Sequence, residues 1–146
     1  MTKAPPPPTL KSARTLTLTY EIPISKTNKF WEGLKENKIF TTRCKKCGEL
    51  YFPPSGDCPS CLSAEMDWVE ISGEAELETF TQIFVRPATF TKYEPYIVAI
   101  GRLKEGVRTL AWLTGIKRED MRVGMKIKLV GKVGPEGTPT YEFVPL

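Results

Sequence analysis

The chain of 146 residues contains no histidine, and this absence excludes several kinds of chemistry. Cys₂His₂ zinc fingers, histidine-based zinc hydrolases and catalysis by Ser-His-Asp or Cys-His groups all need an imidazole. Long apolar runs are also missing, since none approaches the roughly 20 residues that a helix needs to cross a bilayer. The first residues, Met1 to Pro8, hold one lysine and four consecutive prolines, which is not the pattern of a secretory signal. We therefore expect a cytoplasmic protein with no membrane segment.

A strong charge of either sign is lacking too. The 21 basic and 17 acidic residues leave a net charge of +4, and 40% of the residues are hydrophobic, as in a globular protein. A chain of this length holds one ordinary domain or two small modules. The mild positive charge suits an anionic ligand such as a phosphate-bearing cofactor, but it also suits many proteins without one, so charge does not decide the function.

The chain has only four cysteines, and they form two Cys-x-x-Cys pairs. Ten residues separate the first pair, Cys44 and Cys47, from the second pair, Cys58 and Cys61. Each pair turns two thiolates toward one point, so the spacing predicts a zinc ribbon with a tetrahedral four-sulfur site. A catalytic zinc keeps one position open for water, whereas four cysteines fill every position, and we therefore expect one structural zinc ion. Two disulfides or a redox-active Cys-x-x-Cys pair are the alternatives, but a reducing cytoplasm disfavours disulfides.

Composition divides the chain into four segments. We expect a flexible proline-rich tail with a short strand at Leu16–Tyr20, an N-terminal helix, the zinc ribbon and an all-β region, at residues 1–27, 28–40, 41–66 and 67–146.

The expected helix carries an aromatic face. Phe30, Trp31 and Leu34 fall on one side of it, while most of the charged residues fall elsewhere. A helix this short is only marginally stable alone, so its aromatic face must pack on something. The candidates are the chain's own ribbon and another subunit.

The all-β region has the outline of a five-stranded OB-fold barrel. We expect a long first strand with a bend at Gly73, and a helical turn at Arg118–Met121 between the third and fourth strands. The five strands are placed at Trp68–Val85, Tyr96–Leu103, Val107–Thr114, Met125–Val133 and Thr140–Val144. The second strand is apolar on both faces, so we expect the ribbon or the helix to cover its outer side. The predicted fold is thus mainly β, with an N-terminal helix, a rubredoxin-like zinc ribbon and a C-terminal barrel.

The connection Phe84–Pro95 is the main candidate for a ligand- or partner-binding site. It joins the first two barrel strands, a loop position where OB-folds commonly bind ligands. Its candidate residues are two cations for phosphate and three aromatic residues for adenine or an acyl-pantetheine arm: Arg86, Lys92, Phe84, Phe90 and Tyr93. Alternatively, these aromatic residues only close the end of the barrel.

A second constellation supports a different class of function. Tyr96 and Arg102 share one face of the second strand, and Arg108 and Trp112 share one face of the third. On the same side of the sheet they would form a basic and aromatic platform of the kind on which OB-folds stack nucleobases, so a single-stranded nucleic-acid-binding module is the alternative function. The modest charge and the lack of a tract dense in Arg and Lys argue against it.

Catalytic groups are not discernible. Glu74, Glu76 and Glu78 share one side of the first strand, which is typical of an exposed strand face rather than of acid–base work. No nucleophile–base pair stands out, so we expect no enzymatic activity.

The order of the motifs resembles a family of zinc-ribbon plus OB-fold proteins associated with acyl-CoA enzymes and once catalogued as domain of unknown function thirty-five. The matching stretches, in chain order, are Phe30-Trp31-Glu32-Gly33-Leu34, Arg43-Cys44-x-x-Cys47-Gly48, Phe52-Pro53-Pro54, Cys58-Pro59-x-Cys61, Trp68-Val69-Glu70, Ser72-Gly73, Arg86-Pro87, Pro95-Tyr96-Ile97-Val98-Ala99 and Gly124-Met125. One departure is Leu62, since a glycine usually follows the last cysteine and eases a tight turn.

This resemblance implies a non-catalytic accessory or scaffold subunit. Such a subunit binds acyl-CoA or bridges acyl-CoA condensing enzymes of the thiolase and hydroxymethylglutaryl-CoA (HMG-CoA) synthase type. A small ribbon and a five-stranded barrel cannot readily bury all of their aromatic residues, so we expect the helix and the Phe84–Pro95 loop to face the partner. The helix would contribute Phe30 and Trp31.

Overall fold

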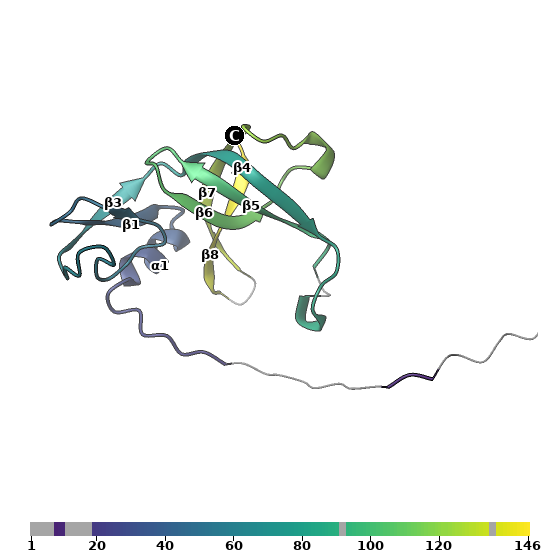
Figure 1. The fold of residues 1–146 in the computed structure, drawn as a ribbon, viewed down its shortest axis with the longest axis horizontal. Helices are drawn as coiled ribbons and strands as arrows, with labels where there is room; N and C mark the ends of the chain where they lie inside the picture. Colours follow the sequence, from purple (N-terminus) through teal and green to yellow (C-terminus); the bar gives the residue numbers. More distant parts are fainter. Residues whose placement is uncertain (1–7, 11–18, 91–92, 135–136) are drawn as a thin grey trace, which may run out of the picture.

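The computed structural model describes residues 8–10, 19–90, 93–134 and 137–146. Within these ranges the helix α1 (Asn28–Lys35) precedes a three-stranded sheet and a closed five-stranded barrel (Figure 1). The predicted fold class, mainly β with an N-terminal helix, a ribbon and a barrel, is confirmed. No helix in the described part of the chain is long and apolar enough to cross a membrane.

The ribbon is built on a small antiparallel sheet. Its strands β1 (Ile39–Cys44), β2 (Leu50–Tyr51) and β3 (Met66–Ile71) lie in the order β2-β1-β3. Two buried threonines of β1 satisfy their hydroxyls on backbone groups. Thr41 donates to the carbonyl of Tyr51, and Thr42 Oγ lies 2.9 Å from both the N and the O of Ser55. These bonds fix the strand that ends at the first metal-site cysteine, because buried polar groups are stable only when paired.

The barrel closes in the order β4-β5-β6-β8-β7. Its strands are β4 (Glu74–Ile83), β5 (Tyr96–Leu103), β6 (Arg108–Leu113), β7 (Lys126–Val133) and β8 (Pro139–Pro145). All of its strand pairs are antiparallel except β6 with β8, which run parallel where the barrel closes. Two short 3₁₀ turns, η1 (Ala88–Phe90) and η2 (Arg118–Asp120), interrupt the connections after β4 and β6.

The long first strand of the prediction is two strands. Its expected bend at Gly73 is a break, after which the chain leaves the ribbon sheet and enters the barrel. Gly73 has a φ of 74°, and a Cβ at this position would collide with the carbonyl oxygen of Leu129. The same glycine accepts a 2.7 Å hydrogen bond from the Leu129 amide. Only glycine fits this left-handed, closely packed position without strain, which explains why the strand ends there.

The helix is shorter than the predicted range 28–40. It ends at Lys35 because Asn37 adopts a left-handed φ of 56°, which asparagine tolerates better than most residues. The chain then turns into β1. The Asn37 side chain accepts a 2.8 Å hydrogen bond from the amide of Gly131, and this bond ties the helix end to β7.

The ribbon and the barrel share one core. Leu34 of α1, Ile39 and Ile71 of the ribbon sheet, and Phe143 of the barrel belong to the same buried cluster. Phe30 is also part of it, with 1% of its surface exposed, which corrects the expectation that Phe30 faces a partner. The helix therefore packs on its own chain.

An aromatic joint fixes this arrangement. The rings of Phe30, Phe52 and Tyr141 meet edge to face, with centroids 5.5–6.0 Å apart. Phe52 follows the ribbon strand β2, whereas Tyr141 belongs to barrel strand β8. Contacts of this geometry stabilise a structure beyond the burial of their area, so the joint holds the ribbon against the barrel.

The outer side of β5 is not covered as predicted. The helix packs on β1, β7 and β8, where the bond between Asn37 and Gly131 holds it. The outward-facing residues Tyr96, Val98 and Ile100 of β5 remain partly exposed. Phe90 of the β4–β5 connection packs against one end of this face instead.

Part of the N-terminal prediction lies outside the described residues. Of the expected strand Leu16–Tyr20 the structure describes only Thr19 and Tyr20, and neither belongs to a strand. Lys26 connects the segment before α1 to the ribbon, because its ammonium lies 2.7 Å from the Asp57 carboxylate.

Candidate functional site

The four cysteines meet at one end of the ribbon. Their sulfur atoms all lie within 4.8 Å of one another, and the pairs Cys44–Cys61 and Cys47–Cys58 are 3.5 Å apart. Four thiolates around a zinc ion at about 2.3 Å lie about 3.8 Å apart, so the cluster fits one tetrahedral metal ion. The two first cysteines, Cys44 and Cys58, are buried, while Cys47 is exposed.

Each Cys-x-x-Cys pair and the residue after it form a zinc knuckle, and the two knuckles have the same backbone geometry. In the first, the Gly48 amide donates to the Cys44 carbonyl, and in the second the Leu62 amide donates to the Cys58 carbonyl, both at 2.9 Å. Gly48 has a φ of 77° and Leu62 a φ of 58°. The departure from the family pattern at Leu62 therefore leaves the knuckle intact, but it places a branched side chain in a left-handed conformation. This side chain is 87% exposed.

We expect Leu62→Gly to stabilise the zinc-loaded protein by about 1 kcal/mol, because a left-handed conformation costs an ordinary residue roughly 1–2 kcal/mol and glycine almost nothing. Chemical denaturation of the zinc-loaded chain measures the change. Gly48→Leu at the equivalent position is the reciprocal variant and should destabilise. Unchanged or lower stability of Leu62→Gly would show that the exposed leucine makes a contact that offsets its strain.

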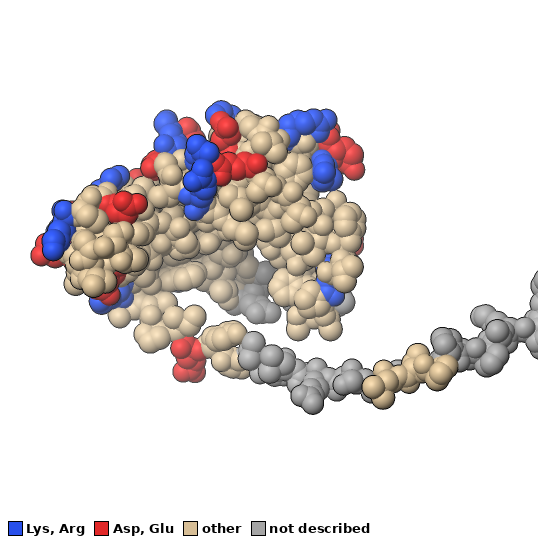
Figure 2. Space-filling view, in the orientation of Figure 1, with Lys and Arg blue, Asp and Glu red and all other residues tan. Residues whose placement is uncertain are grey.

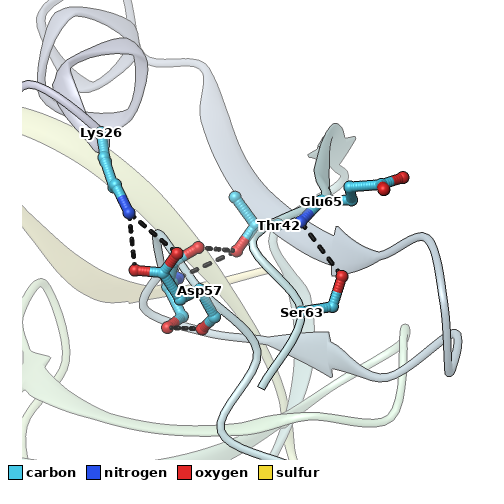
Figure 3. A network of polar contacts seen from close by, with 6 residues as sticks. Lys26, Thr42, Asp57, Ser63 and Glu65 are labelled. Carbon is cyan, nitrogen blue, oxygen red and sulfur yellow. Dashed lines mark hydrogen bonds and ion pairs between the residues drawn. The ribbon is translucent and has the colours of Figure 1, made fainter. Parts of the chain in front are cut away.

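Polar contacts hold the second knuckle in place (Figure 3). Lys26 pairs with Asp57 just before Cys58, and Thr42 bonds the backbone of Ser55. The amide of Glu65 donates to Ser63 Oγ at 3.2 Å. These contacts connect the knuckle loop to the N-terminal segment and to β1, so its position is fixed from both sides.

Two of the thiols are placed in surroundings that favour the thiolate. The Tyr51 hydroxyl, 3.1 Å from Cys58 Sγ, is the main cause that lowers the pKa of Cys58 to about 6. The backbone amide of Cys47 lowers the pKa of Cys44. Hydrogen bonds to the charged form favour ionisation, and metal binding needs the ionised form.

A groove of about 530 Å³ lies on the side of the barrel. We call it the barrel groove. It is bounded by the β4–β5 connection, strand β6 and the β7–β8 hairpin, which is where OB-folds commonly bind their ligands. In Figure 2 the molecule is hollowed at its lower edge, between the projecting β4–β5 connection and the rest of the barrel. Five aromatic residues contribute to its lining: Trp31, Phe90, Tyr93, Trp112 and Tyr141.

The aromatic residues on one wall of the groove are packed on one another. Tyr96 stacks on Trp112 with centroids 4.5 Å apart and planes 17° apart. Tyr93 meets Trp112 edge-on at 5.4 Å, and Phe90 lies 6.3 Å from Trp112. Leu110, two residues from Trp112 on the same face of β6, is 58% exposed. The wall is therefore a preformed aromatic surface.

The charged side chains in the groove and on the adjoining outer face of β5 and β6 are largely paired. In the groove, Lys132 lies 2.9 Å from Glu142, whose carboxylate also accepts a hydrogen bond from Thr114. At the far end of the face, Arg108 lies 2.7 Å from Glu78. Arg102 binds the other oxygen of Glu78.

The predicted basic and aromatic residues do share one face of the sheet, but a glutamate is held between the two arginines. Tyr96 and Trp112 do stack, but Arg108 and Arg102 hold Glu78 between them and keep its pKa below the ordinary value. The strand register explains why both arginines reach Glu78. Arg102 of β5 lies opposite Arg108 of β6, and it also lies beside the bulge at Leu77–Thr79 of β4, which contains Glu78.

The other glutamates of β4 face solvent in ion pairs, as an exposed strand face predicts. Glu74 pairs with Lys104 and Glu76 with Lys126. Figure 2 shows charged side chains gathered along the upper edge of the barrel, while the surface below them is almost free of charge.

The structure brings only some of the predicted binding residues together. Phe90, Tyr93 and Trp31 line the barrel groove. Phe84 is 66% exposed, Arg86 is partly buried, and neither lines the groove. Lys92 lies outside the described residues, and Phe30 is in the core.

Sequence reasoning missed Leu110, Lys132, Tyr141 and Glu142 as groove residues. They come from β6 and from the β7–β8 hairpin, which are distant in sequence and meet only when the barrel closes. The one available signal was the apolar residue Leu110 at an outward-facing position of β6, beside the aromatic residue Trp112.

A four-cysteine ribbon packed on an OB-fold barrel defines a class of zinc-ribbon proteins. Two family models match this chain in the same order. Residues 31–67 match the rubredoxin-like zinc ribbon domain of ChsH2, and residues 68–132 match the C-terminal OB-fold domain of ChsH2. The chain belongs to this family, known as DUF35.

Similar curated proteins carry related descriptions. A DUF35 domain-containing scaffold protein of Methanocaldococcus jannaschii is 34% identical over 77% of this chain and 84% of its own length. The benzoylsuccinyl-CoA thiolase subunit BbsA of Thauera aromatica is 38% identical over 50% of this chain and 49% of its own. A probable enoyl-CoA hydratase alpha subunit of Thermomonospora curvata is 33% identical, but the match covers only 33% of that protein.

Two solved structures have the same fold. The Ltp2-ChsH2(DUF35) aldolase includes a chain that matches with a TM-score of 0.68 and 30% identity, over 81% of this chain and 92% of that one. A DUF35 protein of unknown function from Sulfolobus solfataricus matches with a TM-score of 0.55 and 28% identity, over 72% and 77%.

Proposed function

We propose that this chain is a non-catalytic scaffold subunit that binds acyl-CoA or bridges acyl-CoA condensing enzymes of the thiolase and HMG-CoA synthase type. The barrel groove is the contact surface. The observation that carries the proposal is an open, preformed aromatic groove at the ligand-binding position of the barrel, with its charged groups already paired to one another.

The groove suits an apolar protein segment or the uncharged part of an acyl-pantetheine arm. Its volume of about 530 Å³ lies within the range typical of small-molecule sites. Aromatic residues beside an exposed apolar one, here Leu110, are also typical of protein contact surfaces. Trp31 reaches the groove from α1, because this helix packs between the ribbon and the barrel.

The relatives support the same direction. The names of the most similar curated proteins describe scaffold proteins and subunits of a thiolase and of a hydratase. The solved relative accompanies an aldolase. These descriptions support an accessory role beside an enzyme, and two of them name an enzyme that acts on a CoA thioester.

The nucleic-acid alternative is weakened by the ion pairs that engage the cations of this face. Binding of a single strand depends on cations that follow its phosphates beside the stacking residues. Here Arg102 and Arg108 are engaged by Glu78, and Lys132 is engaged by Glu142. The stacked pair of Tyr96 and Trp112 is therefore without a neighbouring free cation among the described groove residues.

Placing a charge in the groove tests the proposal. Leu110→Lys should leave stability within about 0.5 kcal/mol, because the residue is 58% exposed. It should weaken binding of a thiolase-type partner at least about tenfold, since the new ammonium must lose water in the interface. Affinity is measured by calorimetry with the partner enzyme recovered by affinity capture and identified by mass spectrometry.

Val123→Lys is the matched control. Val123 is 66% exposed and does not line the groove, so this variant should bind the partner like the parent. Equal binding by both variants would assign the interface to another surface. Capture of nucleic acid in place of an acyl-CoA enzyme, seen by absorbance near 260 nm, would contradict the function itself.

A further inference from the structure

The hydroxyl of Tyr51 lies beside the metal site and is not one of its ligands. It is 3.1 Å from Cys58 Sγ and 2.9 Å from the Ser60 hydroxyl. Of the described residues, Tyr51 alone brings a side chain other than a cysteine into hydrogen-bonding distance of one of the four sulfur atoms. The four-sulfur site is therefore asymmetric, because only its second knuckle has such a neighbour.

The position of Tyr51 is fixed by the ribbon sheet. Tyr51 ends β2 and pairs with Thr42 of β1, and its carbonyl accepts the hydroxyl of Thr41. Cys58 is 1% exposed. A rigid donor and a buried acceptor meet here, so the contact does not depend on an exposed, mobile side chain.

The number of available protons decides which group donates in each of these two hydrogen bonds. A phenol has a single proton to donate, and a thiolate bound to a metal can only accept. A hydrogen bond between Tyr51 and a metal-bound Cys58 therefore requires that the Tyr51 O–H point to the sulfur. In that arrangement the Ser60 hydroxyl, 2.9 Å away, donates to the Tyr51 oxygen instead of accepting from it.

We propose that Tyr51 is a positioning residue of the metal site: it donates a hydrogen bond to the metal-bound Cys58 thiolate, with Ser60 donating to Tyr51 behind it, and this chain slows release of the metal. Such a bond to an ionised acceptor is stronger than one between neutral groups. Partners of this kind orient metal ligands and typically change metal affinity about 10–100-fold when removed.

The test uses the full-length chain loaded with zinc. Tyr51→Phe removes one oxygen and keeps the ring. Transfer of zinc to an excess of a chromogenic chelator should be about tenfold faster than in the parent. In the Co²⁺-substituted protein, the thiolate-to-cobalt charge-transfer bands should shift to lower energy, because the Cys58 sulfur loses a hydrogen bond that stabilises its electrons.

Two further variants separate this role from general loosening of the ribbon. Ser60→Ala should speed zinc release by a smaller factor, since Tyr51 keeps its own bond to Cys58. Tyr20→Phe, at an exposed tyrosine far from the cysteines in sequence, should release zinc at the parent rate. Parent-like release and parent-like cobalt bands in Tyr51→Phe would overturn the proposal. Faster release without any shift of the bands would also overturn it, because that result is expected of loosening alone.

Discussion

Cys58→Ser is expected to abolish stoichiometric zinc binding and to unfold the ribbon. The ribbon sheet has a two-residue strand at one edge and little core of its own, so the metal must supply much of its stability. Structural zinc sites contribute on the order of 10–16 kcal/mol of apparent binding free energy in small zinc-finger peptides. Elemental analysis should find about one zinc per parent chain, as a four-thiolate site predicts, and close to none in the variant.

The effect should extend into the barrel. Phe52 packs on Tyr141, so amide hydrogen exchange should accelerate in β1–β3 and also near Tyr141 in β8. Ser63→Ala, which removes an oxygen from the same loop but no metal ligand, serves as the control and should keep its zinc. A Cys58→Ser protein that retains one equivalent of zinc and parent-like exchange would show that the four cysteines do not act as one site.

Phe30→Ala should cost about 3–5 kcal/mol of stability in the zinc-loaded protein. Phe30 is 1% exposed and touches Trp31, Phe52 and Tyr141, so truncation leaves a cavity at the joint between ribbon and barrel. Denaturant unfolding of the zinc-loaded chain measures this cost.

Phe84→Ala is the matched control for the same residue type. Phe84 is 66% exposed, and its truncation should change stability by no more than about 0.5 kcal/mol. If Phe30→Ala proved as stable as Phe84→Ala but lost its partner, Phe30 would be an interface residue after all.

Local patterns were sufficient to predict most of the fold. The spacing of the four cysteines specifies the ribbon because two knuckles of that spacing place four sulfurs at one point. The alternation along β7 places Ile127 and Leu129 in the core and Lys126 and Lys128 outside, as the structure shows. Such patterns depend on one strand at a time.

The errors arose where two distant segments meet. The helix was predicted too long because its end depends on Asn37, whose side chain is held by Gly131 of β7. Phe30 was assigned to an interface because its partner rings, Phe52 and Tyr141, lie far along the chain. Neither contact can be found from helical or strand periodicity.

The metal site could be predicted from the sequence and the groove could not, again because of the distance between the contributing segments. The metal ligands are two local pairs and were predictable, whereas the groove takes residues from α1, β6, β7 and β8. The basic platform is weaker than predicted because Glu78, predicted to be solvent-exposed, lies between Arg102 and Arg108 once β4 and β6 flank β5. A charge count could not reveal that Glu78 cancels one of these two positive charges.

The joint of Phe30, Phe52 and Tyr141 bears on how such a chain can be divided or recombined. The two matched family regions meet between Asp67 and Trp68, within strand β3, and Phe30 and Tyr141 both fall outside their limits. A boundary drawn from sequence similarity therefore cuts through a shared interior. Transfer of only one of the two modules to another protein would expose the rings of the joint to water, so we expect the ribbon and the barrel to be inherited together.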